Sequence, residues 1–480
     1  MAGLRELQLA RRIQVTYLLA ATAAIVGVVN RWLFHTGSAG RIHADEAVAG
    51  LMARDLLNGE WSTFFWGQQY GGTAELIVLA PALAIFGSSA LLILPLIEAI
   101  VLTVFVFAYC QHFLSKQDAL LAASLVWAAP TLWQWFSLRP MLFYQPTLIL
   151  GFMLLVLLHP KRRADRWFIS GIVTGVGWWT SPQILFFAIP AFATCGLSCT
   201  RLRNLGRITG GFCIGAAPWI ATNIATNLSS IRSQPPRSGS FVDHISSQLS
   251  TGWPMAFGLR LPFDETWITD SAPLLYVAFA ALYLTAVLIV YRTHRRAITG
   301  ALGVIPVFIA LQALAPTGSH VGSGRYYIFI VPSIAIVMIA ASSARTGLAT
   351  ISRGIIVVMM LTLSFTGTLL SRDRRMEPTG VEMIAAELVD QELFHIRADY
   401  WSSYLLAWYE PDLVVTANHT DRQPLWTAAV DDASEIAEVF WLGVDYERKR
   451  FDKFMAGNPS VISSEMIDDW AIVVVNRGGP

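Results

Sequence analysis

The sequence contains repeated apolar runs that are long enough to cross a lipid bilayer. A membrane-spanning helix needs about 20 consecutive residues that are mostly apolar, and such runs recur from Ile13 to Leu370. Only 14% of the 480 residues are charged, whereas charged residues make up about 25% of a soluble domain. We therefore predict a polytopic α-helical membrane protein.

Basic residues give these runs an orientation. Lys and Arg collect in cytoplasmic loops, and Arg5, Arg11 and Arg12 precede the first run, residues 13–34. This run is too long for the apolar part of a signal peptide and has no small-residue cleavage site, so we expect a retained span. The chain then reaches the outer face of the membrane at His35.

The segment Leu76–Phe86 decides the number of spans. It is apolar but short, and it contains Pro81, so we interpret it as an interfacial or re-entrant helix, with a short span as the alternative. If it does not cross, all four basic connectors (161–163, 201–207, 292–296 and 345–353) face the cytoplasm; if it crosses, all four face outward. We therefore predict about 11 spans rather than 12. They are residues 13–34, 89–110, 119–135, 144–158, 167–179, 184–197, 208–224, 272–291, 298–314, 327–341 and 354–370.

The sequence changes character after Ser371. Acidic residues become frequent and the apolar runs become short. Residues 379–390 have helical spacing, and four short runs have the composition of strands, at 393–397, 414–417, 439–442 and 471–475. This alternation predicts a small α/β domain. We assign residues 1–371 to a transmembrane domain and 372–480 to an α/β domain outside the membrane.

Charge and cysteine content exclude several other classes. The net charge is +1 and no basic tail or patch is present, so nucleic acid is not an expected partner. The four cysteines lie in apolar runs without a CxxC spacing or a paired histidine. This pattern indicates buried cysteines rather than a disulfide framework or a metal site.

The loop between the first two predicted spans, residues 35–88, is far more polar than its surroundings. A carboxylate in such a loop, for example Asp45, can act as a general base, because it can accept a proton from a substrate hydroxyl or hold that hydroxyl while another bond breaks. The alternative to a catalytic role for Asp45 is a structural one, in which its side chain caps the N-terminus of a helix over residues 47–57. The loop contains five carboxylates, at Asp45, Glu46, Asp55, Glu60 and Glu75.

Further along this loop, the side chains suit a sugar ligand. Trp66, Gln68, Gln69 and Tyr70 offer flat or hydrogen-bonding surfaces, and the two glycines that follow allow a close approach of the backbone. An Asp-Glu pair after the first span, an amphipathic helix, this aromatic and glycine-rich stretch, and Glu75 about thirty residues after the first acid resemble the GT-C glycosyltransferases. The resemblance is strongest to the branch of protein O-mannosyltransferases and the aminoarabinose transferase of lipid A, and it covers most of residues 31–332.

The resemblance implies a GT-C fold and a polyprenyl-phosphate sugar donor, used on the outer face with inversion at C1. It implies that Asp45 is the catalytic or acceptor-binding acid, Glu46 the adjoining acid, and Glu75 the later loop carboxylate. The family has a Lys-Pro pair directly after the last Glu, where this chain has Leu76 and Ile77. Another residue must therefore contact the donor phosphate, or the match of Glu75 is wrong.

Three residues are candidates for this phosphate contact. Arg139 lies in a Leu-Arg-Pro turn with Tyr144 close behind, and its alternative role is that of an interfacial arginine. Arg325 follows two nearby glycines and precedes Tyr326, and a guanidinium can hold a phosphate with two hydrogen bonds. His320 can donate to the phosphate or to the leaving oxygen, with an ordinary loop histidine as the alternative.

Two further features remain open from the sequence. Glu98 lies inside a predicted span, where acids are usually functional, but pairing with Arg139 or Arg325 gives it a structural role. Residues 398–404, Ala-Asp-Tyr-Trp-Ser-Ser-Tyr, resemble Tyr-Trp segments in outer domains of related transferases. The alternative is an aromatic helix that is capped by Asp399.

These observations predict an inverting hexosyl- or pentosyltransferase in a bacterial plasma membrane. Its partners are the bilayer, a polyprenyl-phosphate sugar donor, and an acceptor glycan, lipid or protein. No cofactor is required by the pattern, although Asp45, Glu46 and Glu75 offer ligands for a divalent metal ion. The alternatives are a transporter or flippase of lipid-linked sugars, which predicts broken spans in symmetry-related halves, and a non-catalytic protein that binds sugar lipids.

Overall fold

The computed structural model describes residues 2–160, 166–233, 236–263, 265–316, 324–343, 347–374, 377–458 and 460–476. The chain divides into two compact units, and each is described by itself. The first, here called the helical unit, comprises Met1–Gly40, Tyr70–Glu75 and Leu92–Arg374. The second, here called the sheet unit, comprises Arg41–Gln69, Leu76–Leu91 and Arg375–Pro480.

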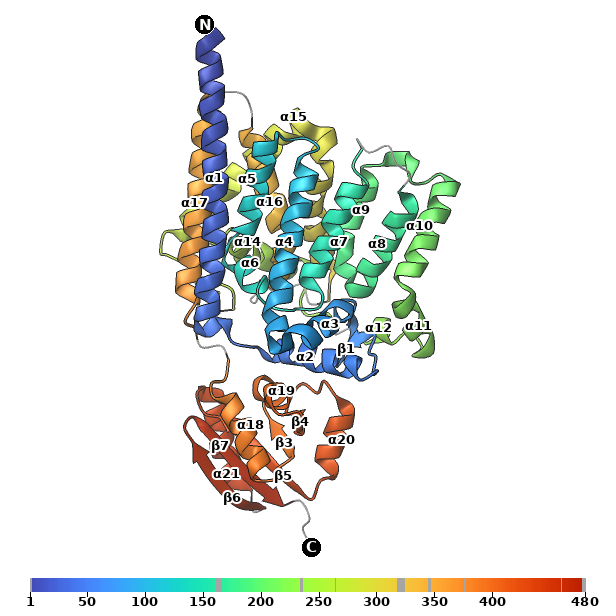
Figure 1. Cartoon of the computed structure of the whole chain (residues 1–480), viewed down its shortest axis with the longest axis vertical. Coiled ribbons are helices and arrows are strands. Elements are labelled where there is room, and N and C mark those ends of the chain that lie inside the picture. Colours follow the sequence, from blue (N-terminus) through green and yellow to red (C-terminus); the bar gives the residue numbers. More distant parts are fainter. Residues whose placement is uncertain are drawn as a thin grey trace. The chain divides into compact units, whose positions relative to one another are not determined.

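The helical unit is built almost entirely from helices (Figure 1). Its helices are α1 (Ala2–Thr36), α4 (Ala90–Cys110), α5 (Lys116–Trp127), α6 (Thr131–Phe136), α7 (Tyr144–Leu157), α8 (Trp167–Thr180), α9 (Leu185–Ala193), α10 (Leu202–Gly215), α11 (Ala217–Ala225), α12 (Ser229–Arg232), α13 (Phe241–Ser247), α14 (Trp253–Ala256), α15 (Ala272–Leu314), α16 (Val331–Ser342) and α17 (Gly347–Ser371).

Helix length and composition confirm a polytopic helical membrane protein. Four helical segments in the described part of the chain are long and apolar enough to cross a membrane, and the bent pair α10–α11 makes a fifth. Shorter apolar helices add to them, and the total of about 11 spans remains a prediction. The four segments are Ala10–Thr36, Leu76–Cys110, Ala272–Thr293 and Ser352–Ser371.

The predicted span over residues 119–135 is not one helix. Proline lacks the N–H that a helix interior needs, and Pro130 separates α5 from α6. The break leaves backbone carbonyls without helical partners, and the Gln134 side chain donates to two of them, at Trp127 and Ala129, each at 3.0 Å. The sequence-based prediction of a continuous span was therefore wrong at this proline.

Two other predicted boundaries also differ. The predicted connector 292–296 lies inside α15, because neither proline nor glycine occurs between Tyr291 and Ile298 to end the helix. The predicted span 208–224 is divided into α10 and α11, which are bent by 67°. Pro218 lies in the first turn of α11, and prolines are a usual cause of such bends.

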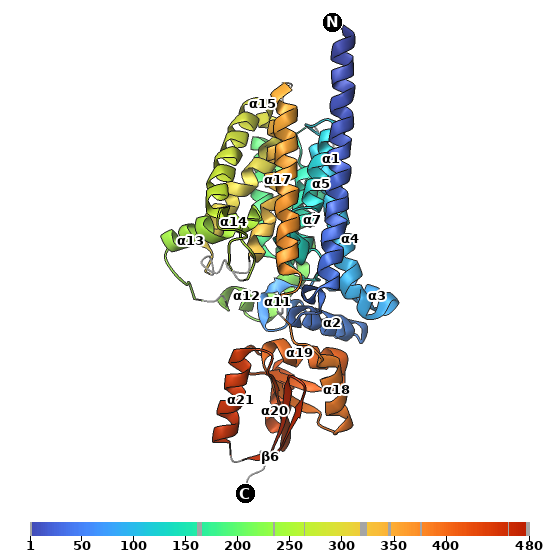
Figure 2. The same cartoon turned by 90° about the vertical axis from the view of Figure 1, so that its left-hand side faces the viewer.

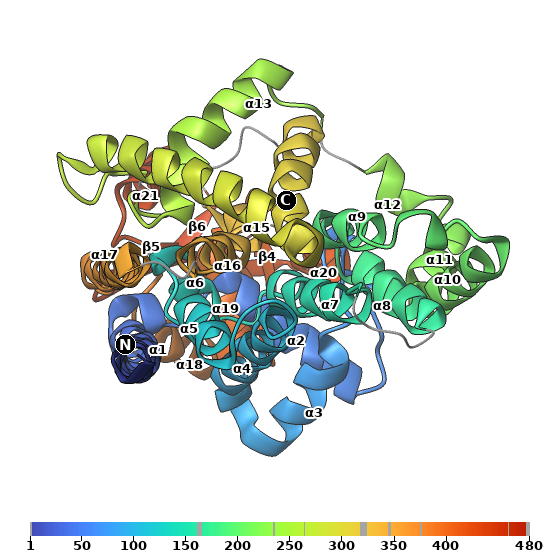
Figure 3. The same cartoon turned by 90° about the horizontal axis from the view of Figure 1, so that it is seen from above.

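A buried ion pair links four helices of the helical unit. Arg353 on α17 lies 2.7 Å from a carboxylate oxygen of Asp118 on α5, and both side chains are buried. The same guanidinium donates to the Thr16 hydroxyl of α1 and to the Ser342 carbonyl of α16. Figure 3 shows α1 beside α5 and α17. Hydrogen bonds of this kind are what make a buried charge tolerable.

The sheet unit contains a five-stranded mixed sheet in the order β4-β3-β5-β7-β6. The pairs β3–β4 and β3–β5 are parallel, and β5–β7 and β6–β7 are antiparallel. The predicted small C-terminal sheet and the helix over 379–390 are confirmed. The elements are α18 (Val381–Asp390), β3 (His395–Ala398), α19 (Tyr400–Tyr409), β4 (Val414–Ala417), α20 (Pro424–Asp432), β5 (Glu435–Trp441), α21 (Asp445–Gly457), β6 (Val461–Ile467) and β7 (Trp470–Asn476).

Helix α2 (Ala44–Leu57) belongs to the sheet unit and packs against α3 (Leu76–Phe86) and α19 (Figure 2). A Cβ at Gly50 would lie 2.4 Å from the Trp408 ring, so the glycine lets α2 and α19 approach closely. Arg54 stacks on this ring at 3.9 Å and donates to the Trp408 carbonyl at 2.9 Å. The helix of the first loop is therefore anchored to the C-terminal segment.

Candidate functional site

The N-terminus of α2 presents Asp45. His43 is the N-cap residue, and its Nδ1 accepts a hydrogen bond of 3.1 Å from the Asp45 backbone N–H. The alternative that Asp45 itself caps this helix was therefore wrong. Because Nδ1 is an acceptor, the ring proton of a neutral His43 lies on Nε2, which is 3.6 Å from Glu377 Oε1. The Asp45 carboxylate is thus available for other contacts.

The carboxylate of Asp45 is held at one oxygen. Tyr400 donates its hydroxyl to Oδ1, and a guanidinium nitrogen of Arg422 lies 3.5 Å from the same oxygen. Oδ2 receives no hydrogen bond from any residue that the structure describes, and the side chain is 25% exposed. The carboxylate is therefore oriented and accessible at the same time.

Arg422 has a partner for each of its guanidinium nitrogens. Two of them donate to the Tyr400 hydroxyl at 3.3 and 3.2 Å, and the third donates to the Trp66 carbonyl at 3.4 Å. When the Gln68 amide is oriented with its oxygen toward Arg422, this oxygen accepts from the two terminal guanidinium nitrogens at 2.7 and 3.0 Å. Arg422 is buried, so the network compensates the cost of burying its charge.

Tyr400 connects the arginine to the acid. An arginine can only donate, so the Tyr400 hydroxyl accepts from Arg422 and its single proton points to Asp45. Burial and the neighbouring Asp45 carboxylate raise the pKa of Tyr400 well above its usual range. Tyr400 is therefore a neutral donor, and Asp45 is the acceptor. Asp399 caps α19 by accepting from two backbone N–H groups, as the sequence alternative predicted.

The other predicted residues of the sheet unit have different surroundings. Glu46 is 4% exposed and lies in the first turn of α2. Gln68 takes part in the Arg422 network, whereas Gln69 is exposed.

In the helical unit, Glu75 is a buried acid. It is 4% exposed, and neither of its carboxylate oxygens has a hydrogen-bond partner among the described residues. Burial raises the pKa of Glu75 above its ordinary range. Glu98 lies close enough to Glu75 for the two carboxylates to repel each other. It forms no ion pair with any arginine that the structure describes. The alternative in which Glu98 pairs with Arg139 or Arg325 was therefore wrong. Tyr70, the remaining predicted loop residue of this unit, is 41% exposed.

Arg139 lies in a structural setting. It is 3% exposed, it stacks on the Trp135 ring at 4.2 Å, and it donates to the carbonyl of Ala39. The carbonyl belongs to the turn after α1, so the guanidinium ties this turn to the end of α6. These contacts favour the structural alternative for Arg139, and its role in binding phosphate stays a prediction.

Three predicted residues meet near the start of α16. The 3-10 helix Arg325–Phe329 follows Gly324, whose φ of +69° suits glycine. Arg325 is exposed and lies over the Tyr326 ring at 5.7 Å. The ring of Tyr144, at the start of α7, lies 6.4 Å from that of Tyr326. His320 lies outside the described residues.

Sequence reasoning missed the two strongest partners of Asp45. Arg422 lies in a loop after β4, without any motif around it. Tyr400 falls in the aromatic segment that the sequence did single out, but no signal connected this segment with the first loop. Only the packing of α2 against α19 brings Tyr400 to Asp45.

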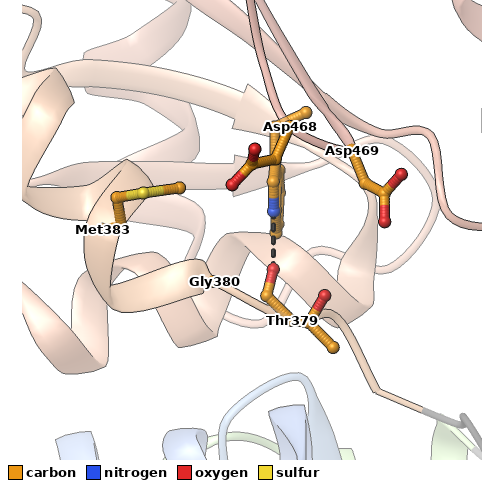
Figure 4. Close-up of a pocket in the computed structure, with 6 residues that line it drawn as sticks. Thr379, Gly380, Met383, Asp468 and Asp469 are labelled. Atoms are coloured by element: carbon orange, nitrogen blue, oxygen red, sulfur yellow. Dashed lines mark hydrogen bonds between the residues drawn. The ribbon is translucent and has the colours of Figure 1, made fainter.

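A surface pocket elsewhere in the sheet unit contains none of the predicted residues. The Trp470 ring N–H donates to the carbonyl of Thr379 at 2.6 Å, and a dashed line marks this bond in Figure 4. Within the described part of the chain, no group of three or more metal-ligating side chains is close enough to hold a metal ion. The pocket is lined by Thr379, Gly380, Met383, Asp468, Asp469 and Trp470.

No protein-family model matches the sequence, and no curated protein matches it either. Solved structures do resemble the fold. ArnT from Cupriavidus metallidurans bound to undecaprenyl phosphate matches with a TM-score of 0.63 and 12% identity, over 96% of this chain and 98% of ArnT. The oligosaccharyltransferase of Archaeoglobus fulgidus, in complex with Zn and sulfate, matches with a TM-score of 0.52 and 12% identity, over 88% of this chain and 67% of that chain.

A further structure of the archaeal enzyme, AglB in complex with an inhibitory peptide and a dolichol-phosphate, matches with a TM-score of 0.50 and 11% identity. It covers 88% of this chain and 69% of AglB. ArnT and AglB are GT-C membrane glycosyltransferases, and this chain shares their fold over nearly its whole length.

Proposed function

We propose that this protein is an inverting glycosyltransferase that moves a hexosyl or pentosyl group from a polyprenyl-phosphate donor to an acceptor glycan, lipid or protein. The shared fold supports this class, because the structures that it resembles were solved with undecaprenyl phosphate and with a dolichol-phosphate. One observation carries the proposal: the Asp45 carboxylate is held at Oδ1 by Tyr400 and Arg422, while its side chain is partly exposed.

Asp45 acts on the acceptor in this proposal. As the acceptor oxygen forms its bond to C1 of the sugar, its proton passes to the Asp45 carboxylate. The bond between C1 and the phosphate oxygen breaks, and the electron pair leaves with polyprenyl phosphate. A single displacement of this kind inverts the configuration at C1.

The remaining roles are assigned by the same proposal. Gln69 and Tyr70 are exposed side chains for contacts to the sugar, and the exposed Arg325 next to Tyr326 and Tyr144 is the contact for the donor phosphate. Glu46 and Glu75 are further candidate residues in this proposal, each in its own unit. The contacts of Gln68 with Arg422 give Gln68 a structural part in it.

The proposal places this activity at the outer face of a bacterial plasma membrane, with about 11 spans and the segment 372–480 outside. The excess of arginines in the predicted cytoplasmic connectors supports this orientation.

The test uses purified protein in lipid, a panel of polyprenyl-phosphate sugars, and an assay for released polyprenyl phosphate. Asp45→Asn keeps the shape of the side chain but removes its basicity, and we expect a loss of about 100-fold or more in rate. Equal turnover by both proteins would remove the catalytic role from Asp45. Tight donor binding without release by either protein, with envelope acceptors added, would instead support a binding protein or a transporter.

A further inference from the structure

We propose that Tyr400 and Arg422 are positioning residues that hold the Asp45 carboxylate in its working orientation, so that the C-terminal segment completes the catalytic site. This inference rests on the proposed function, because it assigns both residues a part in the same transfer step. All three residues belong to the sheet unit.

The contacts of Arg422 show which of its possible roles the structure favours. Its three guanidinium nitrogens are occupied by Tyr400, Trp66, Gln68 and the nearby Asp45. A donor phosphate would have to break several of these bonds to reach the guanidinium. These contacts favour a role for Arg422 in positioning the groups around it, and the only carboxylate among the partners named here is that of Asp45.

The hydroxyl of Tyr400 determines which oxygen of Asp45 accepts the proton from the acceptor. Its bond to Oδ1 fixes the plane of the carboxylate and leaves Oδ2 for an acceptor hydroxyl. A general base must lie within hydrogen-bond reach of the proton that it removes. A carboxylate that rotates freely would spend less time in that position, so both contacts favour the rate of transfer.

Hydrogen bonds and close packing hold both residues in place. Tyr400 is the first residue of α19, which Asp399 caps, and the buried Tyr404 hydroxyl accepts from the Arg422 backbone at 2.7 Å. Gly67, with a φ of +66°, lets the turn of the first loop approach Arg422, because a Cβ there would lie 2.7 Å from the carbonyl of Asp421. Such support keeps a catalytic group in a productive geometry.

The experiment compares Tyr400→Phe, Arg422→Gln and Arg422→Lys with the wild type. The readouts are kcat for release of polyprenyl phosphate and the Kd for polyprenyl phosphate. We expect kcat to fall about 10-fold or more for Tyr400→Phe and Arg422→Gln, because each loses a hydrogen bond or charge contact to a carboxylate. Arg422→Lys keeps the positive charge but loses the planar guanidinium and its fixed set of N–H donors, so its kcat should be intermediate. The Kd should stay within about threefold of the wild type for all of them.

Two control variants report on damage to the sheet unit. Arg397→Gln removes an arginine that contacts Asp431 and Glu438, and Tyr409→Phe removes a hydroxyl from the last residue of α19. Both should retain the wild-type kcat. Tyr400→Phe keeps its ring in place, so it tests the inference even if Arg422→Gln does not fold.

A double variant separates a positioning role from an independent one. If Arg422 acts through Asp45, then Asp45→Asn with Arg422→Gln is no slower than Asp45→Asn alone, whereas independent losses multiply. The inference is overturned if the two losses in rate multiply, if Tyr400→Phe has the wild-type kcat, or if the variants bind polyprenyl phosphate more weakly at unchanged kcat. In each of these cases an inactive Asp45→Asn leaves the proposed function standing. A wild type without turnover on any donor overturns the proposed function, and the positioning role with it.

Discussion

Tyr400 donates its hydroxyl proton to the carboxylate of Asp45, although 355 positions separate the two residues in the chain. The contact is made by the first turn of α19 and the first turn of α2, both of which belong to the sheet unit. The acid of the first loop and the aromatic start of a C-terminal helix are therefore parts of one hydrogen-bonded cluster. Several properties of the molecule depend on the packing that brings them together.

The close approach of α2 and α19 depends on Gly50. Replacing a helical glycine by alanine usually stabilises a helix by about 1 kcal/mol, but here the added methyl would lie 2.4 Å from the Trp408 ring. We expect Gly50→Ala to destabilise the protein by about 1–3 kcal/mol and to lower transfer activity by displacing α2. Thermal unfolding measures the first effect. Gly206→Ala on α10, where a Cβ meets no atom within 4 Å, is the control, and an equal effect of both changes would contradict the argument.

The ion pair of Arg353 and Asp118 should matter strongly for stability when only one partner is removed. Arg353→Met leaves the Asp118 carboxylate buried without its cation, and we expect a loss of about 3–5 kcal/mol. Replacing both residues, with Arg353→Met and Asp118→Leu, should recover much of this loss. Unfolding in detergent checks both values. The exposed pair of Arg372 and Asp373 is the comparison, since breaking it should cost at most about 1 kcal/mol.

Glu447 should make stability depend on pH. It is 2% exposed, and burial raises its pKa to about 7, although the adjacent Arg450 opposes the rise. The folded protein then holds this proton more tightly than the unfolded chain does, so stability falls as the pH rises from about 4.5 to about 7. The melting temperature of Glu447→Gln relative to wild type should therefore increase between pH 5 and pH 8. A constant difference over this range would contradict the assignment.

Arg325 and Arg139 should respond differently to the same substitution. Arg325 is exposed, so Arg325→Gln should weaken binding of polyprenyl phosphate by about 10-fold or more, as loss of a charged hydrogen bond does, with little change in melting temperature. Arg139→Gln removes a buried stack on Trp135 and the bond to Ala39, so it should lower the melting temperature. Binding titrations and thermal unfolding of both variants check this. Normal donor affinity of Arg325→Gln would exclude its proposed contact with the phosphate.

The general architecture was predictable because one physical demand dominates it. Apolar runs of membrane-spanning length leave a chain few alternatives to a polytopic helical fold, and the short alternating runs after Ser371 predicted the sheet. Details that depend on single residues were less accessible. Pro130 broke a run that hydropathy alone reads as continuous, and the basic residues near Arg292 did not end a helix that contains no proline or glycine there.

The site was predictable only where its residues carry a local pattern. Asp45 could be singled out because two acids directly follow a span, and acids in that position are costly unless they are used. His43 as the N-cap and Arg422 as the partner of Asp45 have no such pattern. Their roles arise from hydrogen-bond geometry and from the packing of α19 on α2, and neither is visible in a stretch of sequence.

The anchoring of α2 by Trp408 also has a consequence for the order in which the protein matures. A chain emerging from the ribosome presents Gly50 and Arg54 early, whereas the Trp408 ring that fits against them is made only after the whole helical unit. The helix α2 of the first loop therefore stays without its packing partner until α19 has been synthesised. Asp45 therefore gains its contacts with Tyr400 and Arg422 only after the last helix of the helical unit has been synthesised.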